Sequence, residues 1–201
     1  MKQKCLYLAI ERQFASAGTA IARRVSELSG VPCYGEEILK AVSDKYGVSE
    51  ESIESYEEKT TGSLLYSLFV MSRLSSAESD LLTREGHIFI AEQQAIRTFA
   101  ADGPSIFLGH CACEALKGLP GVMKVFIKAN YGDRIKRAVE EYGFPPEAAN
   151  AVIKKFDKKR ANYFYANTSR KWDDLSGYDI VLDSSAISVD LCAKVLSGLF
   201  S

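Results

Sequence analysis

Five short apolar runs alternate with segments of helical periodicity along the chain, at residues 5–10, 31–34, 105–109, 122–127 and 178–183. Continuous apolar stretches bounded by Gly or Pro predict buried strands, and apolar residues that recur every three to four positions predict helices. Strands without a polar face, separated by helices, are typical of a parallel sheet that is covered on both sides. The pattern therefore predicts an α/β fold of three layers with about five parallel strands.

The first strand segment leads through a loop of small residues directly into a helix. The loop spans Ala15 to Gly18, and apolar residues at helical spacing follow from Ile21 onwards. At the carboxyl end of a parallel strand, such a turn directs backbone N–H groups at a ligand, and small side chains let a phosphate approach them. The loop is therefore a candidate phosphate site, although a plain connection between strand and helix fits it equally well.

The loop agrees poorly with G-x-x-x-x-G-K-[ST], the pattern of phosphate-binding loops. With Gly18 placed on the second glycine, Gln13 stands at the first. Thr19 then replaces the lysine, and Ala20 replaces the hydroxyl that binds Mg²⁺. Because only Gly18 agrees, the case for a phosphate site depends on the rest of the chain.

Composition and charge narrow the classes of function. The 201 residues are 47% hydrophobic and carry a formal net charge of -1. A chain of this length fits one domain with a small insertion, and its charge argues against a dedicated binder of nucleic acid or anionic membranes. The chain shows no apolar run of about 18 residues and no signal-peptide pattern, and its five cysteines are scattered. These features predict a soluble cytoplasmic protein with free cysteines.

His110, Cys111 and Cys113 form the densest group of potential metal ligands. Zinc sites commonly space their cysteines about two to four residues apart and use a second Cys or His pair, which this chain lacks. Buried free thiols at the end of a strand explain the group better. The sequence therefore predicts no metal ligands among the protein's side chains.

A long helical region between the second and third strand segments carries candidate ligand contacts. Residues 36–59 contain eight acidic and three basic residues and fit a solvated helical face. The apolar stretch 64–74 is a candidate surface for a homodimer. A long helix at about 79–101 carries Arg84 and Gln93, which could reach a substrate.

The region 134–171 has the opposite charge, with ten basic residues and four acidic ones. A site at the end of the sheet that faced these cations would suit a polyphosphate. Phosphoryl transfer needs such a setting, because Arg and Lys neutralise the charge that spreads over the equatorial oxygens of the transition state. A basic helix in solvent explains the same charges without a site.

Several motifs follow one another in a characteristic order from the first strand to the last. They are the strand, loop and helix at the start, Arg84 with Gln93, Ile106-Phe107-Leu108-Gly109-His110, Asp133-Arg134-Ile135-Lys136-Arg137, Asp157-Lys158-Lys159-Arg160-Ala161-Asn162-Tyr163, Trp172-Asp173, and Leu182-Asp183-Ser184-Ser185. In this order the motifs resemble the cytidylate kinase-like proteins, which are bacterial relatives of cytidylate kinase among the nucleoside monophosphate kinases. The resemblance spans nearly the whole chain.

The resemblance implies the P-loop NTPase fold of the nucleoside monophosphate kinases. A core of residues 1–34 and 102–201 would carry a helical insertion at about 35–101 and a helical lid at about 131–165. The phosphates of ATP would lie on the loop, with Mg²⁺ held by phosphates and water. A nucleoside monophosphate would lie under the insertion, and closure of the lid would exclude water from the reaction.

The resemblance also implies roles for single residues. The lid arginines Arg134, Arg137 and Arg160 would stabilise the transferred phosphoryl group. Arg84, Gln93, Asp157 and Tyr163 would bind the acceptor nucleotide. The residues that bind ATP would be Arg12, Ala15, Ser16, Ala17, Gly18 and Thr19.

The loop departs from the pattern of the relatives, which usually carry glycines where this chain has Ala15 and Ala17. They also carry a cation where this chain has Thr19. Losing one preorganised cation at a phosphoryl transition state can cost several kcal/mol, or roughly a thousandfold in rate. Arg12 or Arg23 could supply the missing charge.

A second departure lies at the end of the third strand segment, where Gly109-His110 replaces a Gly-Arg pair.

Two functions of different class follow from these observations. The first is an ATP-dependent kinase that transfers the γ-phosphoryl group to CMP or dCMP. The second is a kinase-derived protein that binds or senses a nucleotide with weak or no catalysis. A kinase for another small acceptor is a third reading.

Overall fold

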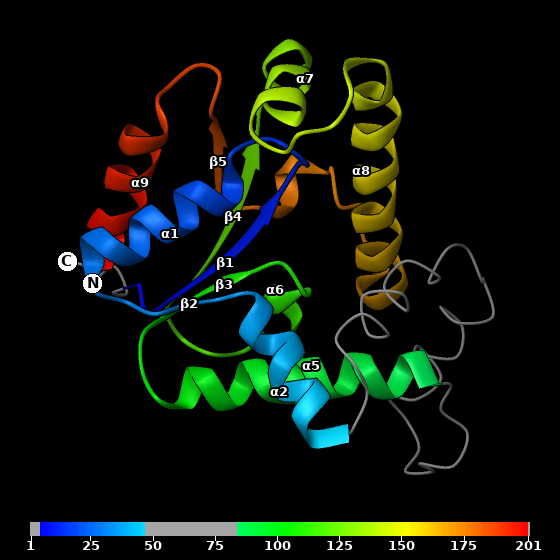
Figure 1. Ribbon diagram of the computed structural model, residues 1–201. Coiled ribbons are helices and arrows are strands. Elements are labelled where there is room, and N and C mark those ends of the chain that lie inside the picture. Colours follow the sequence, from blue (N-terminus) through cyan, green and yellow to red (C-terminus); the bar gives the residue numbers. More distant parts are fainter. Residues whose placement is uncertain (1–4, 47–83, 201) are drawn as a thin grey trace.

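The protein forms a parallel five-stranded sheet with helices on both faces (Figure 1). The computed structural model describes residues 5–46 and 84–200. The strand order is β2-β3-β1-β4-β5, so the first strand lies at the centre of the sheet. The strands are β1 (Tyr7–Arg12), β2 (Cys33–Tyr34), β3 (Ser105–Leu108), β4 (Val122–Lys128) and β5 (Ile180–Asp183).

The helices begin and end at residues suited to those positions. Asn130 caps the start of α7 and Ser188 that of α9, each with a side-chain oxygen that accepts a backbone N–H. Gly30 ends α1 in the left-handed conformation that glycine adopts readily. The helices are α1 (Gly18–Ser29), α2 (Glu36–Tyr46), α5 (Arg84–Ala101), α6 (Ala112–Ala115), α7 (Tyr131–Glu140), α8 (Pro146–Thr168) and α9 (Val189–Ser197), with short 3₁₀ turns η3 (Leu175–Gly177) and η4 (Gly198–Phe200).

Each face of the sheet has its own hydrophobic core. Leu8 and Ile10 of β1 pack against α1 and α9 on one face. Ala9, which points the other way, packs with residues of α2, α5 and α6. Figure 1 shows α1 and α9 on one side of the sheet and α5 with α2 on the other. Because both faces are covered, the strands need apolar side chains in both directions, which explains their continuous apolar runs.

A third cluster joins α7 and α8 to the loop that follows β1. Phe14 of this loop packs with Ala138 of α7 and Ile153 of α8. Its ring also stacks on Phe156 of α8, with centroids 4.5 Å apart. This packing holds one face of α8 beside the carboxyl end of the central strand.

The predicted three-layer α/β fold with five parallel strands is confirmed. Much of the acidic region 36–59 and the whole apolar stretch 64–74 lie outside the described residues, so the dimer surface stays a prediction. The division into core, insertion and lid also stays a prediction. Within residues 5–46 and 84–200, the helices are too short or too polar to cross a membrane.

Candidate active site

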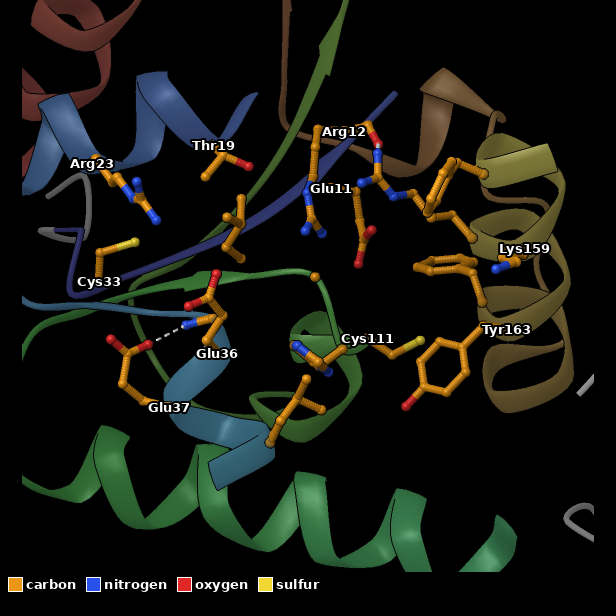
Figure 2. A pocket seen from close by; sticks show the side chains of 18 of the residues that line it. Glu11, Arg12, Thr19, Arg23, Cys33, Glu36, Glu37, Cys111, Lys159 and Tyr163 are labelled. Atoms are coloured by element: carbon orange, nitrogen blue, oxygen red, sulfur yellow. Dashed lines mark hydrogen bonds between the residues drawn. The ribbon is translucent and has the colours of Figure 1, made fainter. Parts of the chain in front are cut away.

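A cavity of about 640 Å³ opens where β1, β2 and β3 end. Its walls come from the end of β1, the first turns of α1, the turn into α2, the turn after β3 and one face of α8 (Figure 2). Ligands of parallel α/β proteins bind at this edge of the sheet, because loops and helix starts converge there. The cavity is therefore the candidate active site.

One face of α8 forms a wall of the cavity. Phe156, Lys159, Arg160, Tyr163 and Phe164 line it. Their spacing of three and four residues places all five side chains on the same side of the helix. The Lys159 ammonium lies 5.0 Å from the centroid of the Phe156 ring. This face therefore offers a ligand both positive charge and aromatic surface.

Arg12 and Arg160 approach each other beside the cavity. Arg160 Nη1 donates a hydrogen bond of 2.8 Å to the backbone oxygen of Arg12. Burial and then the positive charge of Arg12 lower the pKa of Arg160 to about 9. Two partly buried guanidinium groups held close together repel each other, and a bound anion would offset that cost. The pair is the strongest sign of a phosphate site.

Two glycines make room for the Arg12 side chain. A Cβ atom at Gly18 would lie 2.6 Å from the Arg12 Cβ, and one at Gly109 would lie 2.2 Å from Nη1. Arg12 therefore crosses the first residue of α1 and extends its guanidinium to the turn after β3. Arg12 and Thr19, the position at which the sequence lacks a cation, both line the cavity.

Glu11 is a buried carboxylate beside this arginine pair. Its Oε2 accepts a 3.2 Å hydrogen bond from Trp172 Nε1. Burial raises the pKa of Glu11, and the charge of Arg12 opposes that shift most strongly. Figure 2 shows the Glu11 carboxylate next to the Arg12 side chain in the middle of the cavity. Glu11 therefore balances part of the positive charge there.

The backbone of the loop adopts conformations that glycine favours, although the loop contains alanines at these positions. Ala15 and Ala17 have φ angles of 56° and 59°, a left-handed conformation that costs residues other than glycine about 1–2 kcal/mol each. Ser16 Oγ donates to the backbone oxygens of Gln13 at 2.8 Å and Ile127 at 3.1 Å. These bonds and the surrounding packing hold the strained turn in place.

Arg134 and Asp157 form an ion pair that holds this loop. Arg134 is 4% exposed, and its Nη2 pairs with Asp157 Oδ2. Its Nε donates a 2.8 Å hydrogen bond to the Phe14 oxygen, while Asp157 Oδ1 accepts one of 2.8 Å from the Phe14 nitrogen. Both side chains therefore clamp the loop backbone, and neither lines the cavity.

Arg137 contacts the other side of the loop. Its guanidinium lies 3.4 Å from the backbone oxygens of Ala15 and Ser184 and from the Ser184 hydroxyl. Ser184 in turn donates a 2.8 Å hydrogen bond to the Ser16 oxygen. The last turn of α7 and the residue after β5 are thereby joined to the loop.

Two consecutive residues of α5 hold His110 at the back of the cavity. Glu92 Oε1 lies 3.3 Å from His110 Nδ1, and Gln93 Nε2 donates a 3.0 Å hydrogen bond to the His110 oxygen. The Tyr163 hydroxyl donates to Glu92 Oε2. His110 and Tyr163 both line the cavity, whereas Glu92 is entirely buried behind them.

The structure brings part of the predicted site together. Arg12, Thr19, Arg160 and Tyr163 line the cavity, as does Arg23. The remaining predicted residues with described side chains belong to or hold the loop after β1 and the turn after β3; they are Ala15, Ser16, Ala17, Gly18, Gln93, Arg134, Arg137 and Asp157. Arg84 is the first residue of α5, and its side chain lies outside the described part.

Sequence reasoning missed several residues of the cavity. The spacing of Phe156, Lys159 and Phe164 with the predicted Arg160 could have indicated that the whole helix face belongs to the site. Glu11 could have been found as a charged residue inside an apolar strand. Glu92 carried no comparable signal, because its burial depends on the packing of α5 against α8 and the turn after β3.

A parallel sheet whose central strand leads through a loop of small residues into a helix is typical of the P-loop kinase fold. The model of the cytidylate kinase-like family matches residues 7–186. The chain therefore belongs to the cytidylate kinase-like family, as its motifs indicated. No curated protein matches the sequence significantly.

Solved structures support the same fold. An uncharacterized protein from Eubacterium ventriosum has a TM-score of 0.69 and 22% identity, covering 97% of this chain and 98% of its own. Shikimate kinase from Bacteroides thetaiotaomicron has a TM-score of 0.52 and 8% identity, covering 96% and 97%. TT1252 from Thermus thermophilus has a TM-score of 0.53 and 14% identity, covering 98% and 97%. At these identities the likeness concerns the fold alone.

Proposed function

We propose that this protein is an ATP-dependent cytoplasmic kinase that transfers the γ-phosphoryl group to a pyrimidine nucleoside monophosphate, CMP or dCMP. The observation that carries the proposal is the pair Arg12 and Arg160 beside the cavity at the strand ends. Membership in the cytidylate kinase-like family supports a nucleotide kinase. The acceptor is proposed from the family resemblance and from the aromatic and cationic face of α8.

The donor side is formed by the loop and the start of α1. The left-handed turns at Ala15 and Ala17 keep the backbone shape that a phosphate-binding loop requires. No lysine follows Gly18, and Arg12 is the cation that takes over part of its role. The loop therefore fits the phosphates of ATP. Mg²⁺, when bound with ATP, would neutralise phosphate charge, and Thr19 is the hydroxyl nearest the helix start in sequence.

The acceptor side is formed by α8 and the turn after β3. Arg160 would neutralise charge on the transferred phosphoryl group, and Lys159 would attract the acceptor phosphate. Arg134 and Arg137 would not contact the transferred group. They would act by holding the loop in its shape. Asp157 would serve the same purpose through its bonds to Phe14 and Arg134.

A second candidate function is a nucleotide-binding protein with weak or no catalysis. The observation that favours it is the loop itself, where alanine side chains stand at left-handed positions and Thr19 replaces a cation. Such a loop could still bind phosphate through Arg12 while stabilising the transition state poorly.

A single-turnover assay separates the two functions. Excess protein is mixed with Mg·ATP and CMP, dCMP, UMP, AMP or GMP, and products are followed by ³¹P NMR. We expect transfer to CMP or dCMP that falls about a hundredfold in Arg160→Met, the size typical of a lost preorganised charge. Lys154→Met, a change at an exposed position of the same helix, is the matched control and should react normally.

Two results would contradict the kinase. Equal rates in Arg160→Met and Lys154→Met would remove Arg160 from the reaction. Nucleotide binding without detectable transfer in the unmodified protein would favour the second candidate function.

A further inference from the structure

Glu11 places a buried carboxylate where the cavity meets the central strand. It precedes Arg12 at the end of β1 and is 7% exposed. In a strand that is covered on both faces, a charged side chain is costly unless its neighbours satisfy it. An apolar residue would pack there at lower cost. The carboxylate therefore indicates a task in the cavity, which it lines.

A single hydrogen bond reaches this carboxylate within the part of the chain that the structure describes. Trp172 Nε1 donates it to Oε2 over 3.2 Å. An indole N–H is a neutral donor, and one such donor does not offset the cost of removing a negative charge from water. Burial accordingly raises the pKa of Glu11 above its ordinary value. The ionised form therefore depends on positive charges that lie further away.

Charged and titratable groups from five parts of the fold face the Glu11 carboxylate; they are Arg12 of β1, Arg160 of α8, His110 of the turn after β3, Cys113 of α6 and Tyr178, which precedes β5. Burial first, and then the charge of Glu11, raises the pKa values of Cys113 and Tyr178, so both stay neutral. Among the influences that oppose the rise in the pKa of Glu11, the charge of Arg12 is the strongest, and that of Arg160 acts in the same direction. The two arginines therefore keep Glu11 ionised.

An anion at the arginine pair would change this balance. Both arginines line the cavity, and Figure 2 shows the Glu11 carboxylate next to the Arg12 side chain. A dianion that contacts them neutralises the charge that favours the ionised carboxylate, and it adds negative charge beside Glu11. Both effects raise the pKa of a carboxyl group. Binding of the anion therefore favours a proton on Glu11, and by reciprocity a proton on Glu11 favours the anion.

We propose that Glu11 couples the binding of phosphate anions in this cavity to the uptake of one proton. With Glu11 ionised, the carboxylate repels an incoming anion and weakens the field of the two arginines. With Glu11 protonated, that repulsion is absent, and the carboxyl O–H can itself donate to a phosphate oxygen. Glu11 thus determines which charge states the site accepts. The inference rests on the phosphate-binding part of the proposed function and is independent of phosphoryl transfer.

Isothermal calorimetry of the whole protein with sodium sulfate tests the coupling. Sulfate is a suitable probe because its charge does not change over the pH range in which Glu11 would titrate. Heats are measured at about pH 6 and constant ionic strength in two buffers that differ in ionisation enthalpy, which gives the number of protons taken up per sulfate bound. We expect at least about half a proton, and an affinity that rises by up to about tenfold per unit as the pH falls from about 7 to about 5.

Matched variants assign the proton to one residue. Glu11→Gln can still accept the bond from Trp172 but cannot change its charge. It should bind sulfate about tenfold more tightly than the unmodified protein at neutral pH, because one repelling charge is gone, and it should take up no proton. Glu114→Gln makes the same chemical change on α6 outside the cavity and should behave like the unmodified protein. His110→Gln removes the histidine of the cavity, which titrates in the same range, and should keep the uptake.

The outcomes distinguish this inference from the proposed function. Sulfate binding without proton uptake, equal uptake in Glu11→Gln and Glu114→Gln, or uptake that disappears in His110→Gln would each overturn the coupling and leave the phosphate site intact. If Glu11→Gln fails to fold by circular dichroism, uptake by the unmodified protein that persists in His110→Gln supports the coupling. Proton uptake without any phosphoryl transfer would support the coupling and contradict the kinase. Failure of sulfate and inorganic phosphate to bind would overturn both.

Discussion

Gly18 shows at the scale of a single residue how the loop and the cavity depend on each other. In the usual phosphate loop, a glycine at this position lets the backbone approach the phosphate. Here its missing side chain also leaves space for Arg12, because a Cβ would lie 2.6 Å and 2.7 Å from the Arg12 Cβ and Cγ. These atoms belong to the base of the arginine side chain, which cannot swing away as its tip could.

Gly18→Ala should therefore displace either Arg12 or the first turn of α1. We expect the free energy of unfolding to fall by about 1–3 kcal/mol, the usual cost of overpacking, with a loss of phosphate affinity. Urea denaturation and calorimetry with inorganic phosphate measure the two effects. Gly198→Ala is the control, because a Cβ there meets nothing within 4 Å. Equal effects of both changes would show that Arg12 does not depend on Gly18.

At the scale of elements, one ion pair ties both α7 and α8 to the backbone of the loop after β1, beside the packing around Phe14. Arg134 of α7 and Asp157 of α8 bind the two backbone polar atoms of Phe14. Any movement of these helices toward a ligand would carry the loop with it. The arrangement couples the position of Arg160, one turn along α8 from Phe156, to the shape of the loop after β1.

Breaking this clamp should destabilise the fold and not only weaken binding. Arg134→Met leaves Asp157 partly buried without its cation, and we expect a loss of about 2–3 kcal/mol in unfolding free energy, below the 3–5 kcal/mol of fully buried pairs, because Asp157 retains 22% exposure. Lys136→Met removes an exposed pair on the same helix and should change stability by less than about 1 kcal/mol. Comparable losses in chemical denaturation would contradict the clamp.

At the scale of the whole molecule, the titration of Arg160 links stability to ligand binding. Burial lowers its pKa to about 9 in the folded state, well below its value in the unfolded chain. Between these values the unfolded chain binds more protons, so this group makes stability rise with pH in that range. Below about pH 9 the folded protein carries the full cost of the buried charge, and a bound anion offsets it.

Phosphate or nucleotide affinity should therefore be nearly constant from pH 7 to 8 and fall as the pH rises through about 9. Isothermal calorimetry across this range measures the effect. Arg160→Met should bind phosphate weakly, and its affinity should no longer fall as the pH rises through about 9. Without ligand, its melting temperature should be no lower than that of the unmodified protein. A strong loss of thermal stability in this variant would contradict the cost assigned to the buried charge.

The sequence by itself determined the fold class, the strands and the family. These features follow from local periodicity, from Gly and Pro boundaries and from the order of motifs, all of which act over short stretches of chain. The structure confirms the parallel sheet that this local information predicted. The sequence also indicated Arg12, Arg160 and Tyr163, which line the cavity.

Only the tertiary structure decided which charged groups meet. Arg134 and Asp157 pair with each other and with a loop more than a hundred residues earlier in the chain, and Glu92 finds its partners in a turn and a helix that follow it. Periodicity predicts that a helix forms and which face is apolar, but it contains no information about the distant element against which that face packs. The partner of a long charged side chain therefore depends on how separate elements pack together.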